Sequence, residues 1–238
     1  MGELRKYVDV CANKNEEELR KTGDAWALAV AKNKLVYEID WLGVPIIQTP
    51  EDIILMQELI YDVQPDIIIE IGIAHGGGLL FYSSMLSLIG KEQGKVIGVD
   101  IDIRKHNRNV IEKHPMFNKV ILVEGSSIDE ETVNKVKSLV PEGARVLVCL
   151  DSNHYKNHVL QELQKYWDMV SIGSYIVVFD TISSDFAKKS GADKGYADNG
   201  PLEAVHAFLK QNSRFEIDKR YNKLYVSDCQ DGFLRRIQ

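Results

Sequence analysis

The sequence predicts an α/β protein built on a doubly wound, mostly parallel sheet. Between residues 66 and 181, strongly apolar stretches typical of buried strands alternate with stretches typical of helices. The first apolar stretch runs into a glycine-rich turn, and nearly every apolar stretch ends in a carboxylate. Ligands bind at this end of the strands in such sheets. The pattern therefore predicts both a fold class and the edge of the sheet that carries the function.

The length, net charge and cysteine content of the chain disfavour several classes of protein function. The chain has 238 residues, which suits one large domain with an extension, and a formal net charge of −6, which disfavours a general nucleic-acid binder. Its 3 cysteines are far apart, which is typical of a reducing compartment and not of a disulfide framework or a Cys-x-x-Cys metal site. We find neither the apolar core of a signal peptide nor a stretch long enough to span a membrane. We expect a cytoplasmic enzyme or binding protein.

The N-terminal part is predicted to be a helical extension over residues 1–42, which caps the main domain (43–238) or forms a dimer contact. Within the main domain, Thr49 followed by Pro50 predicts the start of a helix, with threonine as the N-cap and proline in the first turn. Apolar residues then recur at helical spacing.

The strands and helices of the main domain are expected to alternate after this helix. We expect strands at 66–72, 94–102, 119–125, 144–151 and 174–181, and helices at 78–90, 103–115, 129–140 and 159–170.

Two later segments complete the chain. Residues 183–205 are polar and contain glycine, and a long irregular segment directly after a strand is often a lid; a plain surface loop is the alternative. Gly200-Pro201 predicts a helix start. Residues 215–227 and 232–237 alternate apolar and polar side chains, which predicts two antiparallel strands in a hairpin.

The glycine-rich turn has the pattern E-x-G-x-x-x-G-G-G from Glu70 to Gly78. A dinucleotide fingerprint would need glycine at 74, where this chain has Ala74, so NAD is disfavoured. The remaining glycines still allow the backbone to come close to a nucleotide-like ligand. A sharp turn without a ligand is the alternative. His75 is either a candidate base or a polar residue covering the site.

Asp100 ends the second strand, where a carboxylate can accept hydrogen bonds from two ribose hydroxyls. Asp102 is a secondary candidate because it shares a strand face with Asp100. Ser126 and Ser127 follow the third strand and suit the edge of an adenine; the alternative is that one of them caps the helix that starts at Asp129. Together these residues favour an adenosine-containing ligand.

Asp151 and Asp180 end two strands that should be neighbours. Two carboxylates in one cleft repel one another unless a cation lies between them, and a set of oxygen ligands suits Mg²⁺ or another hard divalent ion. Alternatively, one of the two acids has a raised pKa and acts as a base.

His154 lies three residues after Asp151. Histidine changes charge close to neutral pH, so His154 is a candidate to remove a proton from a substrate hydroxyl. His158 raises the possibility of a zinc H-x-x-x-H motif, but the glutamate of that motif is missing and a third ligand would be needed.

From about Gly43 to its end, the chain resembles the cephalosporin hydroxylase-type family of S-adenosylmethionine-dependent O-methyltransferases, which includes rhamnosyl O-methyltransferases. The resemblance rests on the order and spacing of "LGVPIIQTPEDI", "PDIIIEIGIAHGGG", "GKVIGVDID", "LDSNH", "VVFDT" and "GFLRRI". It implies a class I methyltransferase fold that binds S-adenosylmethionine and Mg²⁺. The cofactor contacts expected on this basis are Glu70, Gly72, Ala74, His75, Gly76, Gly77, Asp100, Asp102, Ser126, Ser127 and Asp151.

The chain is also similar, more distantly, to metal-dependent catechol-type O-methyltransferases. In those enzymes a proton-accepting lysine follows the first metal-binding aspartate by three positions, and His154 has that offset from Asp151 here. The resemblance implies that Asp151 and Asp180 bind Mg²⁺.

Two positions depart from these families. Some members carry Glu-Asp where this chain has Phe179-Asp180, and catechol-type enzymes carry Asp-Asn where it has Asp180-Thr181. The third ligand is therefore open between Thr181, a water molecule, and a residue of the following loop such as Asp185 or Asp198.

The expected function is Mg²⁺-dependent transfer of a methyl group from S-adenosylmethionine to a hydroxyl of a small molecule or saccharide, with His154 as the base. The alternatives are a non-catalytic cofactor-binding partner of a hydroxylating enzyme and an NAD(P)-dependent oxidoreductase. We expect no nucleic-acid partner and no membrane contact, and a homo-oligomer is possible.

Overall fold

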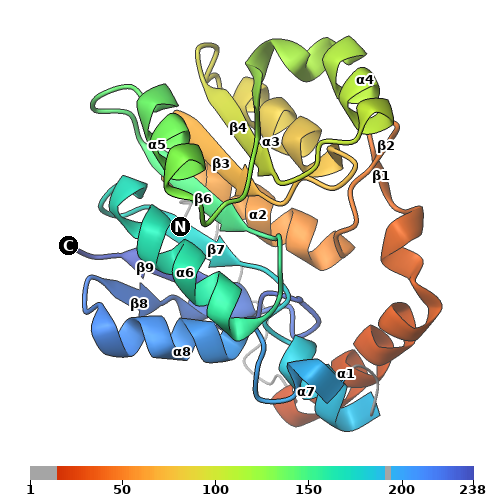
Figure 1. Ribbon diagram of the computed structural model, residues 1–238. Coiled ribbons are helices and arrows are strands. Elements are labelled where there is room, and N and C mark those ends of the chain that lie inside the picture. Colours follow the sequence, from red (N-terminus) through yellow and green to blue (C-terminus); the bar gives the residue numbers. More distant parts are fainter. Residues whose placement is uncertain (1–14, 191–193) are drawn as a thin grey trace, which may run out of the picture.

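A seven-stranded sheet forms the centre of the computed structural model, which describes residues 15–190 and 194–238 (Figure 1). Within the described residues the strand order is β5-β4-β3-β6-β7-β9-β8. The first five strands in this order are parallel, and β9 is antiparallel to both of its neighbours. The bounds are β3 Ile67–Ile71, β4 Lys95–Asp100, β5 Val120–Glu124, β6 Val146–Leu150, β7 Tyr175–Val178, β8 Phe215–Ile217 and β9 Phe233–Arg236.

Helices cover both faces of this sheet because its strands are apolar on both sides. In β3, Ile68 packs into the core cluster that contains α2 and α3, whereas Ile67 and Ile69 pack into the cluster that contains α5, α6 and α8. This alternation follows from the two-residue period of a strand. The helices are α2 Pro50–Val63, α3 Gly77–Leu88, α4 Lys105–Lys113, α5 Glu130–Leu139, α6 Lys156–Tyr166 and α8 Pro201–Gln211, and the short helices η3 Pro115–Lys119 and η4 Trp167–Met169 follow α4 and α6.

The N-terminal extension lies against the carboxyl-terminal half of the chain. It contains α1 Glu16–Asn33, the short helix η2 Leu35–Glu38, and a small antiparallel pair, β1 Asp40–Trp41 and β2 Val44–Pro45. α1 runs beside α7 (Ser183–Ser190), and Lys189 Nζ lies 2.6 Å from Asp24 Oδ2 (Figure 1). Of the extension that was predicted to be helical over residues 1–42, Glu16–Asn33 and Leu35–Glu38 are helical, whereas Asp40–Trp41 form a strand. Residues 1–14 lie outside the described residues, and a dimer contact stays a prediction.

The sheet order creates a switch point between β3 and β6. These parallel neighbours are connected to opposite halves of the sheet, β3 to β4 and β6 to β7. Backbone segments therefore diverge beyond the carboxyl ends of β3 and β6, and ligands bind in the crevice that results in folds of this kind. Gly72 and Asp151 are the first residues beyond these two strands.

The predicted C-terminal hairpin is only partly correct. β8 and β9 pair antiparallel, but residues 218–232 separate them, and this connection contains the short helix η6 Lys219–Asn222 instead of a continued strand. Asp218 explains the early end of β8: its side chain accepts hydrogen bonds from Arg220 N and Tyr175 Oη at 3.0 and 2.8 Å.

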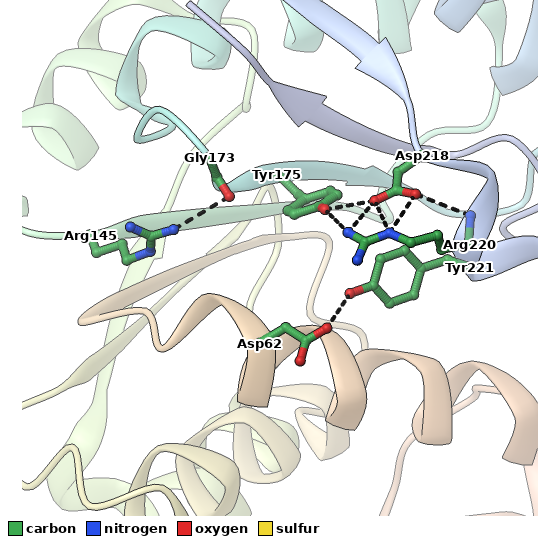
Figure 2. Close-up of polar contacts among 7 residues, drawn as sticks. All are labelled: Asp62, Arg145, Gly173, Tyr175, Asp218, Arg220 and Tyr221. Atoms are coloured by element: carbon green, nitrogen blue, oxygen red, sulfur yellow. Dashed lines mark hydrogen bonds and ion pairs between the residues drawn. The ribbon is translucent and has the colours of Figure 1, made fainter. Parts of the chain in front are cut away.

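Figure 2 shows how this connection is attached to the core. Arg220 pairs with Asp218 at 2.6 Å and also donates to Tyr175 Oη at 3.0 Å, and Tyr221 reaches Asp62 of α2 at 3.5 Å. Burial and the carboxylate of Asp218 raise the pKa of Tyr175 to about 12, so this phenol remains a donor at neutral pH. These polar contacts attach residues 218–222 to β7 through Tyr175 and to α2 through Asp62.

The segment after β7 differs from the irregular lid that we expected. Residues Ser183–Ser190 form α7, and Lys194–Tyr196 form the short helix η5; residues 191–193 lie outside the described residues. The predicted helix start at Gly200-Pro201 is confirmed, with Gly200 as the N-cap of α8.

Cys149 and Cys229 are buried free thiols, whereas Cys11 lies outside the described residues. In the described part of the chain, the structure contains no helix with both the length and the apolar character needed to cross a bilayer.

The cap of α2 gives a test of the fold. Thr49 Oγ1 accepts from Asp52 N at 3.3 Å and donates to the buried Asp52 carboxylate at 2.7 Å. We predict that Thr49→Ala lowers the free energy of unfolding in urea by about 1–2 kcal/mol, because the cap and a partner of a buried carboxylate are both lost. Thr49→Ser keeps the hydroxyl and should stay near wild type; equal losses in both variants would contradict this role of the cap.

Candidate active site

A cavity of about 450 Å³ lies at the switch point, beyond the carboxyl ends of β3, β4, β5 and β6. Its lining contains seven of the predicted site residues, which are Gly72, Ala74, Asp100, Ser126, Ser127, Asp151 and His154, and also His158. The lining also includes residues without a sequence signal, among them Ile101, Tyr155 and Tyr196. We call this the first cavity.

Asp100 connects the end of β4 to the glycine-rich turn. Its Oδ2 accepts a hydrogen bond from Ile73 N at 3.0 Å, and its Oδ1 accepts one from Asp102 N at 3.1 Å. The carboxylate thus faces the turn and lines the first cavity. Asp102 does not: its side chain is exposed and lies 3.7 Å from Arg104, so the expectation that it contacts the ligand is not supported.

The glycines of the turn are required by contacts within the protein. A Cβ on Gly72 would lie 2.2 Å from the carbonyl oxygen of Asp151, and its φ of +87° also favours glycine. A Cβ on Gly77 would lie 2.4 Å from the carbonyl oxygen of Pro45, and one on Gly76 would lie 2.5 Å from Ile111. Gly76 and Gly77 do not line the first cavity, and their contacts with the cofactor stay predictions.

His75 does not line the first cavity either. Its Nδ1 lies 3.3 Å from Asn107 Oδ1, and Asn107 Nδ2 donates to Ala74 O at 2.9 Å. These contacts attach the turn to α4, and the roles of His75 as a cofactor contact or base stay predictions.

Glu70 is buried beneath α3. Its Oε1 lies so close to Gly78 that a Cβ there would be 2.0 Å away, and its Oε2 has no hydrogen-bond partner among the described residues. Burial, and secondarily the charge of Asp100, raise the pKa of Glu70 to about 8. Glu70 therefore packs against the end of the turn at Gly78 and does not itself line the first cavity.

Ser127 is held by a buried carboxylate. Glu162 Oε1 accepts from Ser127 Oγ at 2.5 Å and from Ser152 Oγ at 2.6 Å, and His158 Nε2 lies 3.1 Å from the same oxygen. The N-cap of α5 is Asp129, so the alternative that Ser126 or Ser127 caps this helix is wrong. His158 belongs to this network and not to the candidate metal cluster among the described residues.

A carboxylate centre lies at the ends of β6 and β7. Ligand atoms of Asp151, His154 and Asp180 all lie within 4.8 Å of one another, and His154 Nδ1 is 3.4 Å from Asp180 Oδ2. Gln48 Nε2 donates to Asp151 Oδ2 at 2.8 Å. Asp180 has a left-handed φ of +54°, a conformation that costs energy for a non-glycine residue and is found at functional sites. The predicted juxtaposition of the two aspartates is therefore present.

Negative charge accumulates around this centre. Burial raises the pKa of Asp151 well above its ordinary value, and the carboxylates of Asp180, Glu70 and Asp228 raise it further. Burial and the carboxylates of Asp52 and Asp180 likewise raise the pKa of Asp228 to about 8. A divalent cation between Asp151 and Asp180 would offset this repulsion, and the carboxylate oxygens are the donors that a hard cation prefers.

The hydroxyl of Thr181 donates to the backbone, and its role as a metal ligand stays a prediction. Thr181 is buried, and its hydroxyl lies 3.0 Å from Asp228 O and 2.7 Å from Gln230 O, to which it can donate. Asp198 forms an ion pair with Lys188 at 2.6 Å, and Asp185 is not part of the candidate metal cluster found among the described residues. The third side chain of the candidate cluster, near both aspartates, is that of His154.

Several residues of the site have no signal in the sequence. Gln48 and Asp228 reach the carboxylate centre from loops, and Tyr155 and Tyr196 stack with ring centroids 4.7 Å apart at the first cavity. A polar loop residue has no periodicity, so only the folded chain reveals its neighbours.

Comparison with known proteins shows that the chain matches one protein family. A family model described as rhamnosyl O-methyltransferase/CmcI matches residues 33–237. The rhamnosyl O-methyltransferase of Mycobacterium tuberculosis is 28% identical over 99% of this chain and 95% of the relative. That of Mycobacterium leprae is 26% identical over 82% of each chain.

Solved structures support the fold. The Mg-SAM complex of CmcI has a TM-score of 0.61 at 18% identity, covering 85% of this chain and 78% of that one. An O-methyltransferase from Bacillus cereus in complex with SAH has a TM-score of 0.55 at 16% identity, covering 90% and 87%. The predicted doubly wound, Rossmann-like methyltransferase sheet is confirmed.

Glu70 makes stability depend on pH. Its folded pKa of about 8 exceeds the value of about 4.3 expected in the unfolded chain. Between these values the unfolded chain releases a proton that the folded protein retains, so the stability contributed by this group falls as pH rises. We predict that the stability of Glu70→Gln relative to wild type rises by roughly 2–4 kcal/mol from pH 5 to pH 8.5, because each pKa unit corresponds to about 1.4 kcal/mol.

Urea unfolding at both pH values measures this difference. The exposed Glu142 provides the control, and Glu142→Gln should show no such gain. A difference between Glu70→Gln and wild type that does not change with pH would rule out a raised pKa for Glu70.

Proposed function

This chain belongs to the rhamnosyl O-methyltransferase/CmcI family and is an S-adenosylmethionine-dependent O-methyltransferase, and we propose that it uses a divalent cation to methylate a hydroxyl group of a saccharide or other small molecule. The observation that carries the proposal is the carboxylate centre of Asp151, His154 and Asp180 beside the first cavity. Family membership favours methyl transfer over the two alternatives that the sequence left open, an oxidoreductase and a non-catalytic partner.

The first cavity suits the cofactor. Asp100 lies where a carboxylate binds ribose hydroxyls in related sheets, and Ser126 and Ser127 line the cavity beyond the next strand, at the place expected for an adenine edge. Gly72 and Ala74 present backbone on the other side. The volume of about 450 Å³ is within the range of small-molecule sites. The cofactor contacts that we propose are the predicted residues that line the cavity, namely Gly72, Ala74, Asp100, Ser126, Ser127 and Asp151.

Asp151 and Asp180 would hold the cation. A bound divalent ion of this type supplies charge stabilisation and orients an acceptor oxygen. Gln48 fixes one oxygen of Asp151, and the pairing of β6 with β7 fixes the spacing of the two strands that lead to the aspartates. The CmcI structure similar to this chain is a complex with Mg and SAM, which supports Mg²⁺ as the ion.

His154 would accept the proton of the acceptor hydroxyl. It lies within the carboxylate centre, and it lines the first cavity, which would hold the methyl donor. A hard cation such as Mg²⁺ prefers oxygen ligands to imidazole, so we place His154 beside the ion and not among its ligands. Nδ1 of His154 lies 3.4 Å from Asp180 Oδ2, a contact that would orient the ring.

The acceptor class rests on the relatives and on charge. The mycobacterial relatives are rhamnosyl O-methyltransferases, which supports a sugar hydroxyl. The net charge of −6 disfavours a nucleic-acid acceptor, because phosphate binding needs a basic surface.

Replacement of either aspartate tests the cation. We predict that Asp151→Asn and Asp180→Asn each lower cation-dependent turnover about 10²-fold or more, because a ligand is lost. Binding of S-adenosylmethionine, measured by calorimetry without cation, should change no more than about threefold in Asp180→Asn, because Asp180 does not line the first cavity. Asp198→Asn, which changes an exposed carboxylate paired with Lys188, is the matched control and should remain active. Full activity of either ligand variant in a chelator would exclude the proposed ion.

His154 variants separate a base from a ligand. We predict that His154→Asn lowers kcat about 10²–10⁴-fold, as expected for the loss of a general base, and leaves cation affinity nearly unchanged. The measurements are kcat with saturating cation and a cation titration of the same protein. A large loss of cation affinity, with kcat restored by excess cation, would instead identify His154 as a ligand.

A further inference from the structure

Glu162 of α6 lies behind the wall of the first cavity. Its side chain is buried and does not line the cavity, but it contacts three side chains that do, those of Ser127, Ser152 and His158. Ser127 Oγ and Ser152 Oγ donate to Glu162 Oε1 at 2.5 and 2.6 Å. His158 Nε2 lies 3.1 Å from the same oxygen. One buried carboxylate oxygen therefore organises this part of the wall.

The carboxylate fixes the direction of these hydrogen bonds. A carboxylate oxygen only accepts, so the single hydroxyl hydrogen of each serine is used toward Glu162. Toward the cavity, Ser127 and Ser152 can then offer only the lone pairs of their oxygens. The imidazole of His158 likewise uses the hydrogen on Nε2 for the contact with Glu162. The two serines therefore present acceptors, and not donors, to a ligand in the first cavity.

Keeping this carboxylate buried is energetically costly. Glu162 Oε2 has no hydrogen-bond partner among the described residues, and a charged group out of water is unfavourable unless it is fully paired. An apolar side chain of similar size would fill the same space without this cost. The contacts with three side chains of the cavity wall are the feature that distinguishes Glu162 from such a filling residue.

We propose that Glu162 is a positioning residue that makes the first cavity selective for the exocyclic amino group of adenine. This inference rests on the proposed placement of the cofactor in the first cavity, with its adenine edge at Ser126 and Ser127. The amino group carries two hydrogens and donates to the oxygens of Ser127 or Ser152. A purine with an oxygen in place of the amino group, as in hypoxanthine, brings an acceptor against acceptors, which leaves both sides unpaired and lowers affinity.

Two ligands that differ in this one purine group test the proposal. S-adenosylhomocysteine and S-inosylhomocysteine are titrated by calorimetry into the full chain. We expect the wild type to bind the adenosyl compound at least about tenfold more tightly, because a site built around a hydrogen bond rejects the ligand that cannot form it. In Glu162→Met the serine hydroxyls lose their acceptor and can donate toward the cavity, so the two affinities should come within about threefold of each other.

Ser127→Ala is a second variant, which leaves Glu162 in place. It removes one acceptor from the wall, so the preference for the adenosyl compound should fall by at least about threefold. Glu131→Gln is the matched control: Glu131 is exposed on α5 and does not line the cavity, so this variant should keep the wild-type preference. Equal affinity of the wild type for the two compounds, or a wild-type preference in Ser127→Ala or in Glu162→Met, would overturn the proposal. If circular dichroism shows that Glu162→Met is unfolded, Ser127→Ala decides.

Asp100→Asn separates a failure of this inference from a failure of the proposed cofactor site. Asp100 lines the first cavity and would contact the ribose, which the two compounds share, so this variant should weaken both by a similar factor and keep the preference. Unchanged binding of both compounds by Asp100→Asn would contradict the placement of the cofactor in the first cavity. Weakened binding by Asp100→Asn, together with equal affinities in the wild type, would contradict the role of Glu162 alone.

Discussion

The mutual repulsion of Asp151 and Asp180 is the interaction on which the site depends. The parallel pairing of β6 with β7 brings these carboxylates to the same edge of the sheet, and Gln48 holds one of them in place. Burial and the nearby carboxylate of Asp228 also make ionisation of Asp151 unfavourable in the absence of a cation. The left-handed backbone at Asp180 adds to the energy stored there. A cation bound between the two carboxylates would offset this repulsion.

The rest of the molecule is arranged around this centre. The first cavity lies at the switch point between β3 and β6, and residues of α1 and α7 line another cavity, of about 290 Å³, that Asp180 also lines. The glycines of the turn allow the loops to approach each other: Gly72 packs on the backbone of Asp151, and Gly77 packs on that of Pro45. The turn therefore positions Asp151 at the end of β6 as well as one wall of the first cavity.

Hydrophobic periodicity and chain order were enough to predict the sheet and its acidic edge. Two-sided apolar strands imply a covered parallel sheet, and acids at the ends of neighbouring strands must share an edge, so the proximity of Asp151 and Asp180 could be foreseen. The hydrogen-bond partners of single side chains could not be predicted: Thr181 donates to backbone carbonyls, and His75 contacts Asn107. Contacts from loops, such as that of Gln48, could not be predicted either, because they depend on tertiary packing.

A titration with Mn²⁺, followed by electron paramagnetic resonance, tests the central claim most directly. Wild-type protein should remove the signal of free aqueous Mn²⁺ up to one equivalent per chain, and Mg²⁺ should restore it by competition. The double variant Asp151→Asn/Asp180→Asn should leave the signal of free Mn²⁺ unchanged at the same concentrations. Tight binding of one equivalent by the double variant, or no binding by the wild type, would contradict a shared cation at these two aspartates.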